Sequence, residues 1–256
     1  MLEVTMTRDF SAETVNEGVA SLLENGFYVI EEALPPDHCR DAAQVLDDMI
    51  QRGQAREIPQ FGFAIHPLCG QDSRLADVFC NPLAIAILGE LFGEEPRLVH
   101  TGARVSEASQ APRIGWHVHR YNESENLLPA ESPDRGVRPK RALAGWYLEG
   151  CSPETGPLVV WPRRFNDKLA APFADHGAAW PGEVHVSCPP GSCVLFTCDL
   201  WHAAIAGTTD IRRHLFGAHF QGRSITRKHQ EDHLFEGDAV ERAMAANPDF
   251  GRLIRP

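Results

Sequence analysis

Apolar residues recur at helical spacing in the first third of the chain. The clearest case follows Pro35-Pro36-Asp37, where Ala42, Val45, Leu46 and Met49 fall at positions i, i+3, i+4 and i+7. Glycine marks the end of each such stretch, as expected for a residue that tolerates a left-handed backbone. We therefore predict three helices and one strand: a helix from Ser11 to Gly26, the strand Phe27–Ile30, a helix from Pro35-Pro36-Asp37 to about Gly53, and a helix capped by Asn81 that ends at Gly93.

The apolar period changes to two from Arg97 onward, and proline or glycine separates the alternating runs. Many short strands with such turn residues predict a mainly β fold with flanking helices, namely a double-stranded β-helix, or jelly roll, of the cupin type. The predicted strands are Arg97–Ser106, Trp116–Tyr121, Arg141–Glu149, Leu158–Trp161, Glu183–Ser187, Ser192–Thr197 and Ile211–Phe220.

The length and the pattern together predict one domain over residues 1–256. It would have a mostly helical flank at 1–95, a jelly-roll core at 96–222 and a C-terminal tail at 223–256 with one short helix, Gly237 to Ala246. Two long irregular stretches, Asn122–Lys140 and Arg163–Gly182, interrupt the strands. We interpret the first as a lid, with an idle surface insertion as the alternative.

Composition excludes several classes of protein. The formal net charge is −11 and the basic residues are scattered, which argues against a nucleic-acid surface. The seven cysteines are dispersed and contain no Cys-x-x-Cys pair, so buried, reduced thiols in a cytoplasmic protein are expected. The first thirty residues lack a signal-peptide pattern, and no apolar run is long enough to cross a bilayer.

The candidate chemistry centres on His117 and His119, which flank Val118 in a predicted strand and would point to the same face. His202 follows His117 by 85 residues (202 − 117), and Arg213 follows His202 by 11 (213 − 202). Two histidines with a third ligand between them, and an arginine beyond, are the layout of a non-haem iron oxygenase. The unusual residue is His119, because such enzymes normally carry a carboxylate at that position.

Between Gly26 and Phe220 the chain resembles the phytanoyl-CoA dioxygenase family of Fe(II)/2-oxoglutarate oxygenases. Four blocks carry the resemblance, and their order and approximate spacing match the family. They are Gly26-Phe27-Tyr28-Val29-Ile30 with Ala33-Leu34-Pro35; Trp116-His117-Val118-His119; Gly156-Pro157-Leu158-Val159-Val160-Trp161-Pro162; and Gly191-Ser192-Cys193-Val194-Leu195-Phe196 with Leu200-Trp201-His202 and Arg213.

This resemblance implies Fe(II), 2-oxoglutarate and O2 as cofactor and co-substrates. By position, His117 and His202 would be two of three facial metal ligands. Arg213 would bind the distal carboxylate of 2-oxoglutarate through its planar fork of donors. The alternative for Arg213 is an ordinary ion pair of the barrel.

His119 departs from the family's His-x-Asp motif. An imidazole there could take the third facial position, giving three neutral protein ligands. It could also swing away and leave that position to water, substrate or a halide, although a residue as bulky as histidine argues against halogenation. Glu123, from the predicted lid, could supply a carboxylate instead.

Tyr121 shares the predicted face of the histidine pair and could hydrogen-bond to co-substrate or substrate. Arg104 could contact a carboxylate or lie on the surface. We interpret the remaining candidates as structural: histidines of the core or surface (His100, His185 and His219), a turn-capping Asp199, and tryptophans that fill the core (Trp146, Trp161 and Trp201).

The leading hypothesis is an oxygenase that couples 2-oxoglutarate decarboxylation to hydroxylation, desaturation or cyclisation of a small-molecule metabolite. The alternatives are a three-histidine iron dioxygenase without 2-oxoglutarate, and a catalytically silent member that binds a ligand. No nucleic-acid or membrane partner is expected, and the sequence leaves the oligomeric state and substrate open. Basic residues in and next to the two long loops suggest an anionic substrate, although neighbouring acidic residues weaken this inference. The basic residues are Arg135, Arg138, Lys140, Arg141, Arg163 and Arg164.

Overall fold

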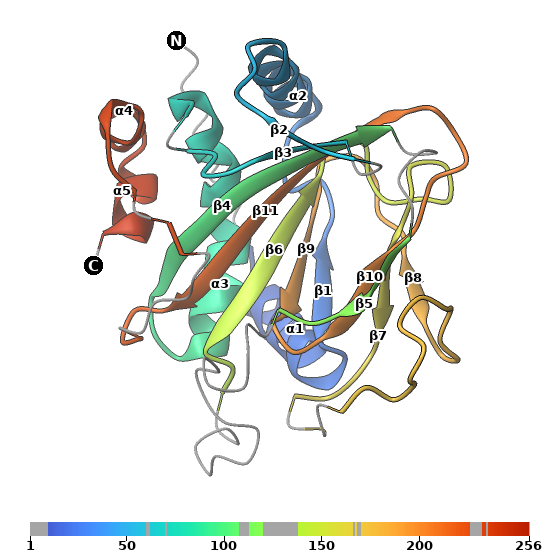
Figure 1. The fold of residues 1–256 in the computed structure, drawn as a ribbon. Coiled ribbons are helices and arrows are strands. Elements are labelled where there is room, and N and C mark those ends of the chain that lie inside the picture. The colour runs from blue at the N-terminus through green and yellow to red at the C-terminus, as the bar shows by residue number, and fades with distance from the viewer. Residues whose placement is uncertain are drawn as a thin grey trace.

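Two antiparallel sheets form the body of the protein in a computed structural model (Figure 1). The residues it describes are 10–59, 62–69, 71–107, 113–119, 138–165, 167, 170–225, 232–233 and 235–255. The larger sheet has the strand order β1-β9-β6-β11-β4-β3-β2, and the smaller has the order β5-β10-β7-β8. This is the predicted jelly-roll arrangement.

The strands of the larger sheet come from both ends of the described chain. They are β1 (Phe27–Ile30), β2 (Arg56–Ile58), β3 (Gly62–Ile65), β4 (Pro96–Glu107), β6 (Arg141–Tyr147), β9 (Ser192–Thr197) and β11 (Arg212–Gly222). Those of the smaller sheet are β5 (Ile114–His117), β7 (Leu158–Trp161), β8 (Val184–Val186) and β10 (Trp201–Ala204). The helical elements are α1 (Ala12–Glu24), α2 (Pro36–Gln51), the 3-10 helix η1 (Ser73–Cys80), α3 (Pro82–Phe92), α4 (Asp238–Ala246) and α5 (Pro248–Ile254).

The helix ends follow from local chemistry, as predicted. The Ser11 hydroxyl accepts a hydrogen bond from the Thr14 amide at 3.1 Å, at the start of α1. The Asn81 side chain does the same for Ala84 at 2.9 Å, and Pro82 occupies the first helical position of α3. α3 ends at Gly93, whose φ of 73° is left-handed.

Alternation along β11 divides the interior into two layers. Phe216, Ala218 and Phe220 pack against the helices that cover one face of the larger sheet. Leu215 lies on the opposite face, against an apolar cluster that includes Leu143 and Val160 from the two facing sheets. The inner face, between the sheets, therefore carries the odd-numbered positions of β11.

His214 fixes α2 to the outer face of the larger sheet. Its two ring nitrogens lie 2.7 Å from a Glu149 carboxylate oxygen and 3.1 Å from an Asp47 carboxylate oxygen. Burial opposes the charged form of this imidazole, yet the hydrogen bond and charge of Glu149 leave its pKa raised. Asp47 also pairs with the neighbouring Arg212 at 3.2 Å. The even-numbered residues at the start of β11 therefore attach α2 to the sheet.

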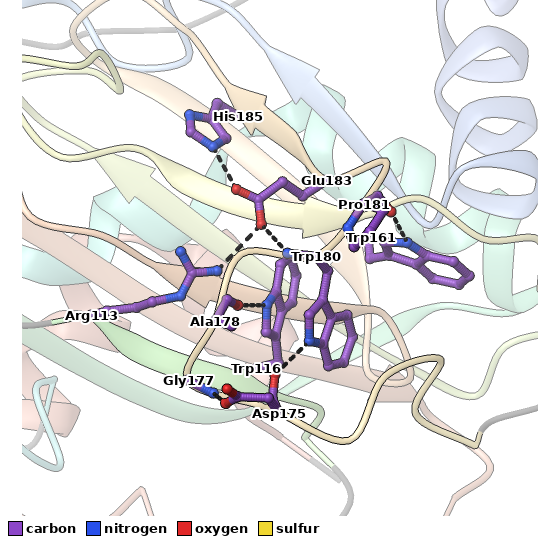
Figure 2. A network of polar contacts seen from close by, with 10 residues as sticks. All are labelled: Arg113, Trp116, Trp161, Asp175, Gly177, Ala178, Trp180, Pro181, Glu183 and His185. Atoms are coloured by element: carbon purple, nitrogen blue, oxygen red, sulfur yellow. Dashed lines mark hydrogen bonds and ion pairs between the residues drawn. The ribbon is translucent and has the colours of Figure 1, made fainter.

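The loop predicted at Arg163–Gly182 lies, in its described part, against the outer face of the smaller sheet (Figure 2). The indole rings of Trp116 and Trp180 stack with centroids 4.4 Å apart, and that of Trp201 lies 5.5 Å from Trp180. The Trp116 indole N–H donates to the Ala178 carbonyl at 2.8 Å. Glu183 accepts from the Trp180 amide at 2.8 Å, and also pairs with Arg113 at 3.4 Å. This packing covers the outer face of β5 and β10.

Several elements differ from the prediction. β5 ends at His117 rather than continuing to residue 121, and β10 was not predicted as a strand. The short β2 and β3, the 3-10 helix η1 and the last helix α5 were also missed. β2 and β3 have only three and four residues, too few to show an alternating pattern.

The seven cysteines are all free, and five of them are buried. Burial raises the pKa of the Cys39 thiol to about 11 and that of Cys69 to about 12. Within the described residues, no single helix has the length and apolar character needed to cross a membrane. Among these same residues one pair of helices, η1 and α3 with a 58° bend between them, passes that test by length and composition.

Candidate metal centre

Three histidines from the smaller sheet and its edge converge on one point. His117 ends β5 and is the direct cross-strand partner of His202 on β10. Together with His119 they form the primary cluster, in which one ring nitrogen from each residue lies within 4.8 Å of the others. The ring centroid of His202 lies 4.2 Å from that of His117 and 4.9 Å from that of His119. Such a set of imidazole nitrogens can hold a divalent transition metal.

Backbone carbonyls orient two of these rings. The Nδ1 atom of His117 lies 2.8 Å from the Gly115 carbonyl oxygen, and that of His202 lies 2.9 Å from the Leu200 carbonyl oxygen. A carbonyl can only accept, so each Nδ1 carries the proton and the lone pair remains on Nε2. Metal-binding histidines are typically fixed in this way by a second hydrogen bond.

The protein keeps the primary cluster neutral. Burial lowers the pKa of His202 to about 3, and it also lowers the pKa of His117. The pKa of His119 is lowered well below its ordinary value, first by burial and then by the neighbouring His202 and His117. All three imidazoles are therefore unprotonated at neutral pH, the form that binds a metal.

His119 reaches the cluster without belonging to the strand. The prediction that His117 and His119 share a strand face was wrong in this detail, because β5 pairs with β10 only as far as His117 and His202. Beyond that pair, the His119 amide donates to the Cys198 carbonyl at 3.0 Å. This bond turns the chain so that His119 also lies 5.3 Å, between ring centroids, from His219 on β11.

Arg213 lies on the inner face of β11, at the far end of the strand from His219. Its Nη1 donates to the Gly156 carbonyl at 2.9 Å, and its Nη2 has one partner among the described residues, the Ser106 hydroxyl at 3.5 Å. A Cβ on Gly156, whose φ is 85°, would lie 2.7 Å from that Nη1. Glycine at 156 thus makes room for the guanidinium, and Nη2 keeps donor capacity for an anion.

Tyr147 is a residue at this site that the sequence reading missed. It is the cross-strand partner of Leu215, and it is buried in the same inner layer. Burial raises its pKa well above the ordinary value, while the nearby Arg213 acts in the opposite direction. The phenol is therefore a neutral hydrogen-bond donor beside a guanidinium. Alternation of inward- and outward-facing residues along the predicted strand Arg141–Glu149 could have placed Tyr147 on the inner face.

The remaining predicted site residues are Arg104, Tyr121, Glu123 and Asp199. Arg104 is the cross-strand partner of Leu215, so it lies on the same face of the larger sheet as Arg213; it is exposed, and its charge acts on His66. Tyr121, Glu123 and most of the predicted lid fall outside the described residues. Asp199, expected to cap a turn, pairs through its carboxylate with the buried Arg163 at 2.9 Å.

Four described basic residues in or beside the two long loops are paired with carboxylates of the chain, so part of their charge is offset within the protein. The pairs are Arg138 with Glu90, Arg141 with Asp232, Arg163 with Asp199, and Arg164 with Glu24. Of the predicted core tryptophans, Trp146 is fully buried on the helix side of the larger sheet, whereas Trp161 and Trp201 lie in the outer cluster behind the smaller sheet.

The phytanoyl-CoA dioxygenase family model matches residues 22–215, which include the primary cluster and Arg213. The chain belongs to this family. A search of curated proteins finds no match. The family assignment agrees with the jelly roll and with the position of His117 and His202 on its smaller sheet.

Solved structures support the same fold for this phytanoyl-CoA dioxygenase family member. SnoN, a non-haem α-ketoglutarate-dependent epimerase from nogalamycin biosynthesis, is 14% identical with a TM-score of 0.67, over 90% of this chain and 95% of SnoN. EctD from S. alaskensis is 18% identical with a TM-score of 0.65, over 90% and 82%. HygX from Streptomyces hygroscopicus, solved with nickel and 2-oxoglutarate, is 15% identical with a TM-score of 0.63, over 83% and 89%.

Proposed function

We propose that this family member is an iron oxygenase that uses 2-oxoglutarate and O2 to oxidise a small-molecule metabolite. The observation that carries the proposal is the convergence of three neutral imidazoles, His117, His119 and His202, on the inner side of a jelly roll that also presents Arg213. Structural relatives named for α-ketoglutarate chemistry, or solved with 2-oxoglutarate, share this fold. The family assignment and the guanidinium favour this function over a dioxygenase without an oxo-acid.

The donor set fits Fe(II). Imidazole is a good ligand for first-row divalent metals, and three protein ligands leave positions for other molecules. His117 and His202 would bind through Nε2, since their Nδ1 atoms are engaged with backbone carbonyls. Arg213, with its neighbour Tyr147, would hold the distal carboxylate of 2-oxoglutarate by charge-assisted hydrogen bonds.

Bound iron would supply the O2 activation and oxidising power, and the chain's own residues position the reactants. Arg213 fixes one end of the co-substrate, and its rigid anchoring on Gly156 sets that position. Apolar side chains such as Val160 and Phe196, which pack in the layer beside His202, keep water away from the centre. Gly217 leaves open space on this face of β11, because a Cβ there would meet nothing within 4 Å. That space suits a bound small molecule.

Anaerobic absorption spectroscopy tests this proposal directly. Adding Fe(II) and then 2-oxoglutarate to the metal-free protein is expected to produce a visible metal-to-ligand charge-transfer band. Fe(II) with succinate, which lacks the keto group, serves as the control and should give no such band. Absence of the band at saturating Fe(II) and 2-oxoglutarate would contradict the proposal, and release of succinate and CO2 under air would support it.

Replacing His119 with aspartate is expected to strengthen Fe(II) binding. A carboxylate offsets one positive charge of the metal, whereas the three imidazoles offset none. We also expect faster 2-oxoglutarate decarboxylation without substrate oxidation, since the native histidine is part of a site tuned for its own reaction. Fe(II) titration and succinate release measure the two effects. Unchanged affinity and unchanged coupling in His119→Asp would show that residue 119 does not bind the metal.

A further inference from the structure

A second group of three histidines lies on the larger sheet, separated from the primary cluster by the His219 ring. His66 follows β3, His100 lies in β4, and His233 precedes α4. One ring nitrogen from each lies within 4.8 Å of the others, the same limit that the primary cluster meets. The centroid of His100 lies 4.2 Å from His233 and 5.3 Å from His66. We call these residues the second cluster.

The backbone around the second cluster is shaped to admit these rings. A Cβ on Gly102 would lie 2.2 Å from the His66 ring, so glycine at this position of β4 lets His66 lie over the strand. The His233 amide donates to the Val99 carbonyl at 2.8 Å, and the Thr101 amide donates to His233 Nδ1 at 3.2 Å. Three separate segments of the chain are thus held in register around one point.

Two of the three rings in the second cluster have lowered pKa values. Burial lowers the pKa of His66 to about 4, followed by the effects of His100, Arg104 and Arg56. Burial likewise lowers the pKa of His233 to about 4, although Asp232 acts in the opposite direction. Neutral imidazoles bind transition metals, whereas protonated ones would repel them.

We propose that His66, His100 and His233 form a second binding site for a divalent transition metal such as Zn(II). Three imidazole nitrogens on one ion leave a fourth position open. Arg56 and Arg104 place positive charge near His66, and both are exposed, so a small anion such as chloride or hydroxide suits that fourth position. Because part of the His66 side chain is exposed to solvent, the ion can enter there.

Binding of a metal here would exchange one contact for another. Thr101 N–H donates to His233 Nδ1, so in the metal-free protein the His233 proton resides on Nε2. Coordination through either ring nitrogen breaks this hydrogen bond, because binding through Nε2 would move the ring proton onto Nδ1. The Thr101 amide is therefore expected to report metal binding by a change in its hydrogen-exchange rate.

The site would attach the segment at 232–233 to the larger sheet. That segment already makes one buried ion pair, in which Asp232 lies 2.7 Å from Arg141. Arg141 also lies 2.9 Å from His219 Nδ1, and the His219 ring stands between the clusters, 4.7 Å from His100 and 5.3 Å from His119. A second metal would thus brace the wall of the barrel that faces the primary cluster.

Metal counting in a variant that lacks the primary cluster tests the proposal. The protein is untagged His202→Ala, freed of metal with a chelator and then dialysed against Zn(II) alone. It is expected to retain one equivalent of Zn(II), measured by elemental mass spectrometry. Adding His66→Ala and His233→Ala should remove it and weaken Zn(II) binding at least about tenfold in calorimetry. Zn(II) should raise the unfolding temperature of His202→Ala and leave that of the triple variant unchanged. The matched control is His202→Ala with His185→Ala, which removes an exposed histidine.

Equal Zn(II) retention in His202→Ala and in the triple variant, or none in either, would overturn the proposal. His66 is exposed, so His66→Ala alone in the same background keeps the test valid if the triple variant does not fold. The two sites remain distinguishable. Failure of the primary cluster would appear as equal metal content in wild type and His202→Ala, while the second site is judged only within the His202→Ala background.

Discussion

Substitution of His202 by alanine is expected to abolish Fe(II) binding at the primary cluster, and with it 2-oxoglutarate turnover. His202 is buried, directly opposite His117 and 4.9 Å in ring centroids from His119, so no other described side chain can take its place between them. Loss of groups that merely orient a ligand typically costs about 10- to 100-fold in metal affinity. Loss of the ligand itself should exceed that range.

The measurement is anaerobic Fe(II) titration followed by the charge-transfer band with 2-oxoglutarate. His185→Ala, on the exposed side of the same sheet, is the control and should match wild type in both. His202→Gln, closer in size, guards against collapse of the core beside Phe196, and circular dichroism verifies its fold. Wild-type Fe(II) affinity in either His202 variant would place the metal elsewhere.

Replacement of Arg213 by alanine is expected to raise the KM for 2-oxoglutarate by about 10- to 100-fold, since hydrogen bonds to charged groups contribute about 1.5–3 kcal/mol. Fe(II) affinity should change little, because the hydrogen bonds of the guanidinium to described residues go to Thr155, Gly156 and Ser106 rather than to the primary cluster. Arg213→Lys should recover only part of the effect. Lysine keeps the charge but lacks the planar fork.

Arg212→Ala provides a matched control from the adjacent position. Arg212 points to the other face of β11, where it pairs with Asp47 of α2, so its loss should leave the KM unchanged. Steady-state succinate release at varied 2-oxoglutarate measures the comparison. A KM for Arg213→Ala equal to that of wild type, or matched by Arg212→Ala, would show that the oxo-acid is held by other groups.

Local chemistry explains what the sequence predicted well. The helices begin at Ser11 and Asn81 and end at glycine because capping depends on a few neighbouring residues. β7 and β9 begin and end where predicted. β7 is a short apolar run between Pro157 and Pro162, and β9 follows Gly191. The inward face of β11 followed from alternation alone, and it placed Arg213 and Arg212 on opposite sides.

Features that depend on distant segments were not predictable. β5 ends at His117 because its partner β10 ends the pairing there, and nothing in the local sequence marks that end. His66 and His233 are 167 residues apart (233 − 66) and meet only because both segments reach the edge of β4. His100 was therefore interpreted as an ordinary core residue. Only the tertiary structure brings the second cluster together.

The stacked indoles on the outer face of the smaller sheet give the protein a built-in optical signal. Trp116 is the sequence neighbour of His117, and Trp201 that of His202, so two indoles of this outer cluster adjoin ligands of the primary cluster. A change of ion occupancy on the inner side of β5 and β10 is therefore expected to alter tryptophan emission on the outer side. Intrinsic fluorescence can thus follow loading of the site in unlabelled protein.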